Sequence, residues 1–167
     1  MAVPVQLRIT LVDSEPKVWR AVVVPAEMKL AGLHDVIQRA MGWQHLHDYS
    51  FQVGLGAQRV VMGDGTLKDL FADAGERPVY YNYDSDSGWR HRLSVEPLAA
   101  EVEQLPACVG GAAACPPEGT GGVWGYDRLL ARMEDMEDPD YVELLDRYGD
   151  FDPDAFDLAA ANARLLG

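Results

Sequence analysis

Cysteine, positive charge and long apolar runs are scarce in this sequence. Two cysteines in 167 residues give no disulfide framework, and a chain of this length buries about 70% of its unfolded surface without needing one. No stretch approaches the ~20 apolar residues that span a bilayer. The N-terminal MAVPVQLRIT has no basic segment followed by an apolar core. We therefore expect no membrane span, no secretory signal and a cytoplasmic, reducing location.

Positive charge is outnumbered and unevenly distributed. The chain has 14 Lys and Arg against 27 Asp and Glu, a formal net charge of −13, and residues 108–167 hold four basic residues against thirteen acidic ones. DNA affinity depends largely on Lys and Arg that neutralise phosphates, and no basic stripe is evident. Direct nucleic-acid binding is therefore not expected. The acidic surface serves solubility, and a basic partner stays an open alternative.

The first hundred residues have the periodicity of a sheet with one helix. Val5, Leu7, Ile9 and Leu11 alternate with polar residues, as in a half-buried strand. Leu30, Leu33, Ile37 and Met41 are three or four apart, as on one face of a helix that ends before Gly42. The same reasoning predicts further strands at 18–24, 49–53, 78–83 and 89–96, and a short helical turn at 66–71 that Thr66 caps.

The rest of the chain changes in composition. A Gly- and Pro-rich loop is predicted over residues 106–124, and helices are predicted near 126–133, 139–147 and 153–166. The fold class is therefore α+β: a mixed β-sheet with one crossing helix, similar to a β-grasp sheet, with C-terminal helices packed on it. We expect one domain over 1–167, made of a sheet-rich part (1–105), the loop (106–124) and a helical part (125–167).

The loop CVGGAAACPPEGTGG holds both cysteines and invites four interpretations. A phosphate-binding loop would need glycine at position 124, where Trp124 stands. A disulfide between Cys108 and Cys115 would contribute on the order of 2–3 kcal/mol, although a reducing compartment opposes it. A metal site would use thiolate and imidazole ligands, and a structural joint would bury the cysteines. The last two interpretations remain the main rivals.

Zinc is the metal that the available ligand types favour. The candidate ligands are Cys108, Cys115, His47 and His91. His45 and His47 are two residues apart and would face the same way on an extended chain, whereas His91 on an apolar strand face is typical of a core histidine. None of the spacings matches a zinc finger, and no Gly-x-Ser-x-Gly or His-Glu-x-x-His motif is present.

Several long phrases together resemble one protein family. They are VWRAVVVPAEMKLAGLHDVIQRAMGW, HLHDY, YDSDSGWRH, PACVGGAAACPPEGTGGVWGY and FDPDAFDL, in this order along nearly the whole chain. They are similar to the Ri-plasmid ORF-3-like family, also known as transposon-passenger TnpR-type proteins. The family is largely uncharacterised, and its resolvase-like name comes from an association with mobile elements. Its matching positions here are His45, His47, Asp84, Trp89, His91, Cys108, Cys115, Pro116, Pro117, Glu118, Gly121, Gly122 and Tyr126.

The chain departs from the family pattern in two places. The family often has a second acid in Tyr-Asp-Phe-Gly-Asp, where this chain has Ser87 and offers Asp86 instead. It often has Asp-Cys after the glutamate, where this chain has Gly119 and Thr120, so a third cysteine ligand is lacking.

Three functions remain in view after this comparison. The first is a non-catalytic binding or accessory module for an unknown protein or small molecule. The second is a metal- or thiol-dependent enzyme, and the third is a recombination accessory factor associated with DNA. The candidate site comprises His45, His47, Asp84, Trp89, His91, Glu118 and Tyr126.

Overall fold

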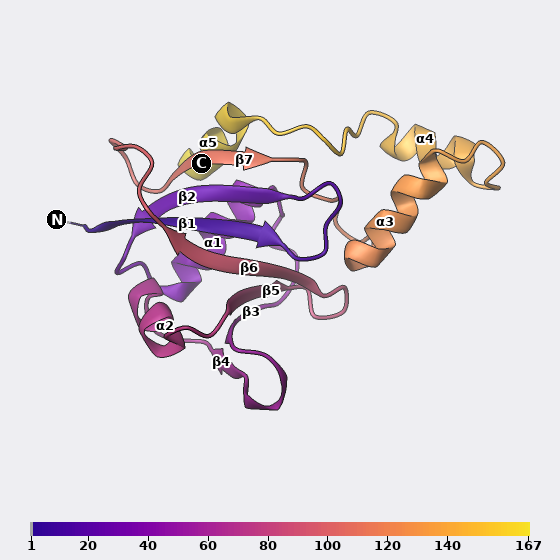
Figure 1. The fold of residues 1–167 in the computed structure, drawn as a ribbon. Coiled ribbons are helices and arrows are strands. Elements are labelled where there is room, and N and C mark those ends of the chain that lie inside the picture. Colours follow the sequence, from indigo (N-terminus) through magenta and orange to yellow (C-terminus); the bar gives the residue numbers. More distant parts are fainter. Residues whose placement is uncertain (1) are drawn as a thin grey trace.

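The computed structural model describes residues 2–167 and is built around one seven-stranded sheet (Figure 1). The strand order across the sheet is β4-β3-β5-β6-β1-β2-β7, and every pairing is antiparallel. The strands are β1 (Pro4–Leu11), β2 (Trp19–Pro25), β3 (Tyr49–Val53), β4 (Val60–Met62), β5 (Val79–Tyr83), β6 (Trp89–Glu96) and β7 (Ala107–Ala112).

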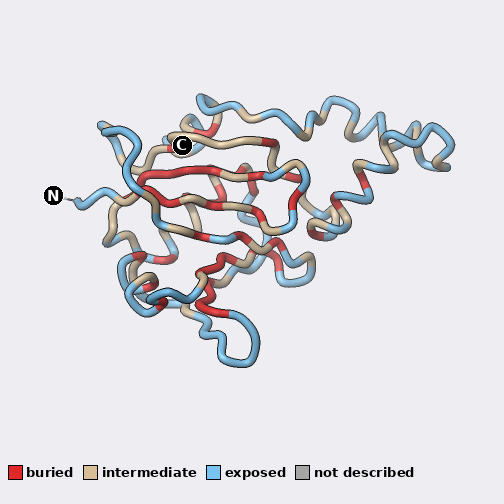
Figure 2. The backbone as a smooth tube through the Cα atoms, viewed as in Figure 1, coloured by how far each residue is buried: buried red, intermediate tan, exposed pale blue. Residues whose placement is uncertain are grey.

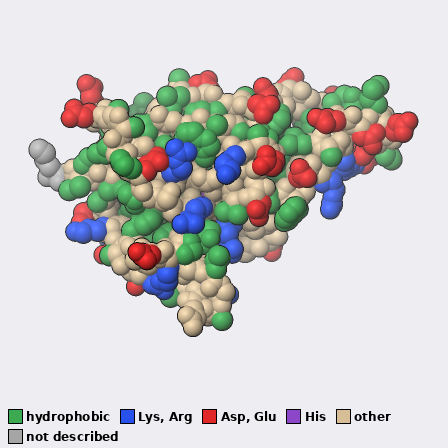
Figure 3. All heavy atoms as spheres, in the orientation of Figure 1, with side chains coloured by type: hydrophobic (Ala, Val, Ile, Leu, Met, Phe, Trp, Pro, Cys, Tyr) green, Lys and Arg blue, Asp and Glu red, His purple; other side chains and the backbone are tan. Residues whose placement is uncertain are grey.

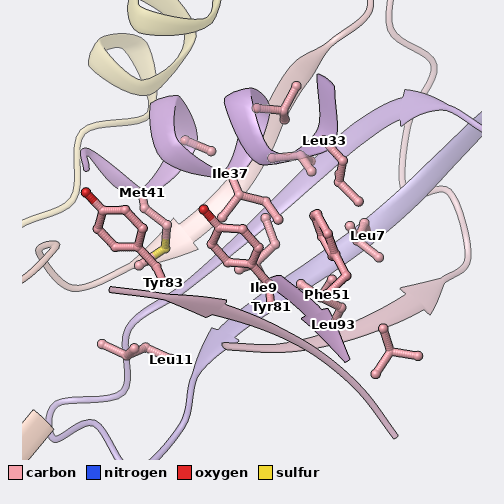
Figure 4. Close-up of a cluster of buried hydrophobic side chains, with 14 of the residues drawn as sticks. Leu7, Ile9, Leu11, Leu33, Ile37, Met41, Phe51, Tyr81, Tyr83 and Leu93 are labelled. Carbon is pink, nitrogen blue, oxygen red and sulfur yellow. The ribbon is translucent and has the colours of Figure 1, made fainter. Parts of the chain in front are cut away.

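The core lies between the sheet and helix α1 (Leu30–Met41). Alternation places Leu7, Ile9 and Leu11 of β1 on the same face as Phe51, Tyr81 and Leu93 of the neighbouring strands. Leu33, Ile37 and Met41 of α1 point toward these side chains (Figure 4). The buried backbone runs through the central strands, whereas the tip of the C-terminal part is largely exposed (Figure 2).

The other helices have different roles. Helix α2 (Leu67–Ala74) starts with a capping box between Thr66 and Asp69, as the sequence predicts for Thr66. Helix α5 (Leu158–Leu166) packs on α1 and on β7. Asn162 of α5 accepts from the backbone N–H of Cys108 at 2.9 Å and donates to its carbonyl at 2.9 Å, which covers the edge strand.

Helices α3 (Gly122–Met133) and α4 (Tyr141–Tyr148) extend away from the sheet (Figure 1). The α4 helix buries none of its residues. Arg132 joins the two helices through ion pairs with Asp138 at 2.9 Å and Asp140 at 2.7 Å. None of the helices within residues 2–167 combines the length and apolar character that crossing a bilayer requires.

The α+β class is confirmed, and three details of the prediction are wrong. The sheet is antiparallel where a mixed sheet was expected, because β1 lies antiparallel to both of its neighbours. The predicted loop contains strand β7. The C-terminal helices do not all pack on the sheet, since α4 is exposed and α5 begins at Leu158 rather than near Pro153.

Candidate functional site

The candidate site forms where the loop after α1 meets the turn between β5 and β6. Asp84 donates its backbone N–H to the carbonyl of Asp48 at 2.8 Å, and Ser85 donates its backbone N–H to the Asp48 carboxylate at 3.0 Å. This backbone N–H lowers the pKa of Asp48 below its usual range. Asp84 has a left-handed φ of 58°, a conformation that Asp tolerates. The turn is therefore held in one shape by the loop beside it.

Glu118 comes from the Gly- and Pro-rich segment and binds the same loop. Its Oε1 accepts the backbone N–H of Gln44 at 2.7 Å, and its two oxygens accept the Tyr83 hydroxyl at 3.0 and 3.1 Å. Burial, together with the Glu118 carboxylate, raises the pKa of Tyr83 to about 12, so this hydroxyl stays protonated and donates. Glu118 thus connects the Gly- and Pro-rich segment to the loop after α1 and to the end of β5.

His47 lies between the two carboxylates. Its Nε2 is 3.4 Å from Oε2 of Glu118 and 3.7 Å from Oδ2 of Asp84. The Asp84 and Glu118 side chains are 7% and 15% exposed, against 38% for His47. Within residues 2–167, no hydrogen bond reaches the Asp84 carboxylate, so this nearly buried acid keeps its accepting capacity free.

Asp84 also lines a pocket of about 420 Å³, to which His47 and Glu118 do not contribute. Polar side chains line it from β3, β5 and β6 and from the turn after β1, and the exposed Trp124 of α3 lines it as well. The lining residues are Val12, Asp13, Ser50, Asn82, Tyr83, Asp84, Ser85, Ser87, Gly88, Arg90, Val123 and Trp124. A concave site with a few convergent polar groups and an aromatic wall is typical of small-molecule binding.

Two buried donors near the turn have no hydrogen-bond partner among the described residues. They are Nε1 of Trp89, which begins β6, and the hydroxyl of Tyr126 in α3. Helix α3 starts against the turn, since a Cβ on Gly122 would lie 2.2 Å from the Ser87 carbonyl oxygen. Both unpaired donors therefore belong to elements that begin at this turn. Each of them costs folding free energy, because a buried donor without an acceptor has lost its hydrogen bonds to water.

Two predicted site histidines lie elsewhere. His45 has φ of 58°, so the chain is not extended there, and its ring turns away from that of His47 to bind Asp35 of α1 at 2.8 Å. His91 is fully buried: Nδ1 donates to the carbonyl of Tyr81 at 3.1 Å, and Nε2 accepts from Nε1 of Trp43 at 3.2 Å. His91 is thus a core histidine with both nitrogens occupied, and it cannot also be a metal ligand.

The predicted zinc site is not assembled. Within residues 2–167, no group of three or more His, Cys, Asp or Glu side chains is arranged to hold a metal ion. The thiols are free, and burial raises the pKa of both Cys108 and Cys115, which opposes thiolate chemistry. The Cys108 thiol donates to the carbonyl of Gly110 at 3.4 Å, and both thiols lie near the buried Arg20 rather than beside His47.

The structure thus brings together His47, Asp84 and Glu118 from the predicted set. It adds Tyr83, Arg90 and Trp124, which the sequence analysis did not single out. Tyr83 directly precedes Asp84 in YYNYDSDSGW, so its place at the end of a strand was a usable signal. No feature of the sequence indicated that Arg90 and Trp124 line the pocket, because their proximity to it depends on the shape of the turn and on where α3 starts.

Comparison with known proteins places this architecture in a family. A family model described as plasmid pRiA4b ORF-3-like protein matches residues 4–160. An uncharacterised protein, y4hQ of Sinorhizobium fredii (strain NBRC 101917 / NGR234), is 36% identical over 169 residues, covering 95% of this chain and 86% of the relative. A crystal structure of a protein of unknown function, MM3350 of Methanosarcina mazei Go1, superimposes with a TM-score of 0.77 at 27% identity. That match covers 93% of this chain and 96% of the other.

The chain therefore belongs to the plasmid pRiA4b ORF-3-like family, as the resemblance of its phrases indicated. The solved relative shares the fold, and neither relative carries a functional name.

Proposed function

We propose that this member of the plasmid pRiA4b ORF-3-like family is a non-catalytic binding module, whose pocket at the β5–β6 turn holds a small molecule. The ligand presents a cationic or hydrogen-bond-donating group to Asp84. The observation that carries the proposal is the Asp84 carboxylate itself: it is 7% exposed, lines the pocket and accepts no hydrogen bond within residues 2–167. A nearly buried carboxylate whose ion-pair partner, His47, stays 3.7 Å away gains from a ligand that donates hydrogen bonds to it.

The surroundings of Asp84 suit recognition better than turnover. Glu118 is already used by Gln44 and Tyr83, so it acts as a fixed support for the loop. Burial raises the pKa of the two thiols, which keeps them protonated, and neither thiol lines the pocket. A reducing cytoplasm is compatible with these free thiols. An accessory role in mobile elements would give such a module a partner.

Substitution of Asp84 tests the proposal. Asp84→Asn keeps the left-handed backbone, because Asn also tolerates that φ, but it removes the charge. Ligand binding is measured by thermal shift and by amide NMR with a panel of ethylamine, choline and agmatine, alongside acetate as an anionic control. We expect at least one amine or guanidine to bind, and Asp84→Asn to weaken that binding by about tenfold or more.

Asp86→Asn is the matched control, because Asp86 lies in the same turn but is exposed and does not line the pocket. It should bind the probe as the wild type does. Equal weakening by both variants would mean that only the general negative charge attracts the probe. Binding of acetate alone, or of no amine at millimolar concentration, would refute the assignment of Asp84 as the recognition group.

A further inference from the structure

The face of the sheet opposite α1 carries a cluster of arginines. Strand alternation sends Arg8 of β1 and both Arg90 and Arg92 of β6 to this face, opposite to Ile9, His91 and Leu93. In Figure 3, Lys and Arg side chains gather over the sheet, whereas Asp and Glu side chains dominate the part of the surface over α3 and α4. This face of the sheet is therefore richer in positive charge than the helical part, which is acidic in the sequence as well.

The strand register makes the three arginines near neighbours on this face of the sheet. Thr10 pairs with Arg92 and Arg8 pairs with Ser94, so Arg8 and Arg92 are diagonal neighbours. Arg90 is two residues from Arg92 on the same face, and each of these separations is roughly 7 Å between Cα atoms. Such proximity of like charges is unfavourable unless an opposite charge compensates it.

The chain compensates only one of the three. Arg8 pairs with Glu96 at 3.0 Å and lies 4.0 Å from the centroid of the Trp19 ring. Arg90 and Arg92 have no ion pair anywhere in residues 2–167, although the protein has nearly twice as many acidic as basic residues. Arg90 donates to Asn82 at 3.2 Å, which fixes its orientation and leaves its charge unbalanced.

Tyr80 supports both unpaired guanidinium groups. The guanidinium carbon of Arg90 is 5.2 Å from the centroid of the Tyr80 ring, and that of Arg92 is 5.8 Å from it. Tyr80 is 8% exposed, so its ring lies beneath these side chains. Planar guanidinium groups held on a ring keep their N–H donors available and present them in the fork geometry that matches phosphate oxygens.

We propose that Arg8, Arg90 and Arg92 form a binding site for the phosphate group of a small soluble molecule. A long polyanion is disfavoured, because the net charge of −13 repels it beyond the immediate patch. Stacking of a nucleic-acid base is disfavoured as well, because the Tyr80 ring is covered. This site overlaps the Asp84 pocket only at Arg90, because Arg8 and Arg92 do not line that pocket.

Titration calorimetry of the full chain with phenyl phosphate and inorganic phosphate tests this site at fixed ionic strength. We expect saturable binding of phenyl phosphate, and a loss of about tenfold or more in affinity for Arg92→Gln. Arg92→Lys should recover only part of that affinity, because lysine keeps the charge but not the fork. Arg128→Gln is the matched control, since Arg128 is exposed on α3 and has no ion pair within residues 2–167; it should bind as the wild type does.

Two further probes distinguish the source of the phosphate. A twenty-nucleotide oligothymidylate and phosphatidylglycerol vesicles present the same group on a polyanion or a lipid surface. Binding of either without binding of phenyl phosphate or inorganic phosphate would overturn the proposal, as would equal weakening by Arg92→Gln and Arg128→Gln. A folded Arg92→Gln protein, verified by its unchanged unfolding midpoint, that binds phenyl phosphate like the wild type would also overturn it. If Asp84→Asn did not change amine binding, the function proposed for the Asp84 pocket would fail, whereas the proposed phosphate site would still stand.

Discussion

Replacing Arg20 by alanine is expected to lower the free energy of unfolding by about 3–5 kcal/mol, because it leaves a cavity and removes four hydrogen bonds to backbone carbonyls. Arg20 is 2% exposed and lies on the α1 side of β2. It donates to the carbonyls of Ala40 at 2.9 Å, Trp19 at 2.8 Å, Ala112 at 3.1 Å and Met41 at 3.4 Å. Two of these carbonyls end helix α1, whose last turn lacks internal donors.

The charge of Arg20 has no carboxylate partner within residues 2–167. Burial lowers its pKa to about 10, so it remains a cation at neutral pH. Its compensation comes from the helix C-terminus, which favours cations, and from the Phe156 ring, whose centroid is 4.3 Å from the guanidinium carbon. Arg20 therefore connects β2, α1, β7 and the segment before α5 through a single side chain.

Urea unfolding of Arg20→Ala, Arg20→Lys and Arg128→Ala measures this contribution. Arg20→Lys should recover little, because lysine has no planar fork to reach carbonyls on both sides. Arg128→Ala should change the free energy by less than about 0.5 kcal/mol, as is usual for an exposed position. A loss below about 1 kcal/mol for Arg20→Ala would show that the four carbonyls find other partners.

The sequence predicts the elements whose side chains repeat with a clear period. The alternation in β1 and the spacing of Leu33, Ile37 and Met41 identify the strand and the helix that make the core. Strand β7 escapes the same reasoning, because ACVGGA has no alternation and its glycines favour a loop interpretation. A Cβ on Gly111 would lie 2.7 Å from the Phe156 ring, so that glycine permits close packing rather than a turn.

The start of α5 shows a different limitation. Asp152-Pro153-Asp154 has the chemistry of a helix N-terminus, yet Asp152 only accepts the backbone N–H of Asp154 at 3.0 Å and forms a local turn. The helix begins at Leu158, where Asp157 accepts the N–H of Ala160 at 3.1 Å. Two capping signals close in sequence cannot be ranked without the packing of Ala161 on the core.

The candidate site could be predicted only in part, because it is formed by contacts between segments that are distant in the sequence. His47, Asp84 and Glu118 could be chosen by residue type, but His45 could be separated from His47 only by its left-handed backbone. The arginine cluster is also hidden in the sequence: Arg8 and Arg92 become neighbours only through the register of β1 and β6. The sequence shows no basic stripe, because the arginine cluster is formed by residues of different strands.

The second large effect is a loss of folding stability at mildly acidic pH, and it involves His91. Burial lowers the pKa of His91 to about 4 from an ordinary value of 6.5. The unfolded chain therefore binds more protons than the folded one between pH 6.5 and pH 4, so stability is complete above pH 6.5 and falls as the pH is lowered toward 4. The loss over this window is on the order of 3 kcal/mol from His91.

The geometry explains why the protonated form is excluded. Trp43 can only donate from Nε1, so Nε2 of His91 must be the unprotonated acceptor while Nδ1–H donates to Tyr81. A second proton would place two donors face to face in the core. The pKa of His34 is also lowered to about 4, mainly by burial and then by the neighbouring His45. His34 therefore adds to the loss of stability at acidic pH.

Urea midpoints measured from pH 7.5 down to pH 4 for wild type and His91→Gln separate the two histidines. The side-chain carbonyl of glutamine can still accept from Trp43, and glutamine does not titrate. We expect His91→Gln to be less stable than the wild type at pH 7.5 and to lose less stability on acidification, with the remaining slope due mainly to His34. Parallel pH profiles for the two proteins would mean that His91 takes up its proton over the same pH range in the folded and unfolded chains, and the assignment of its ring nitrogens would be wrong.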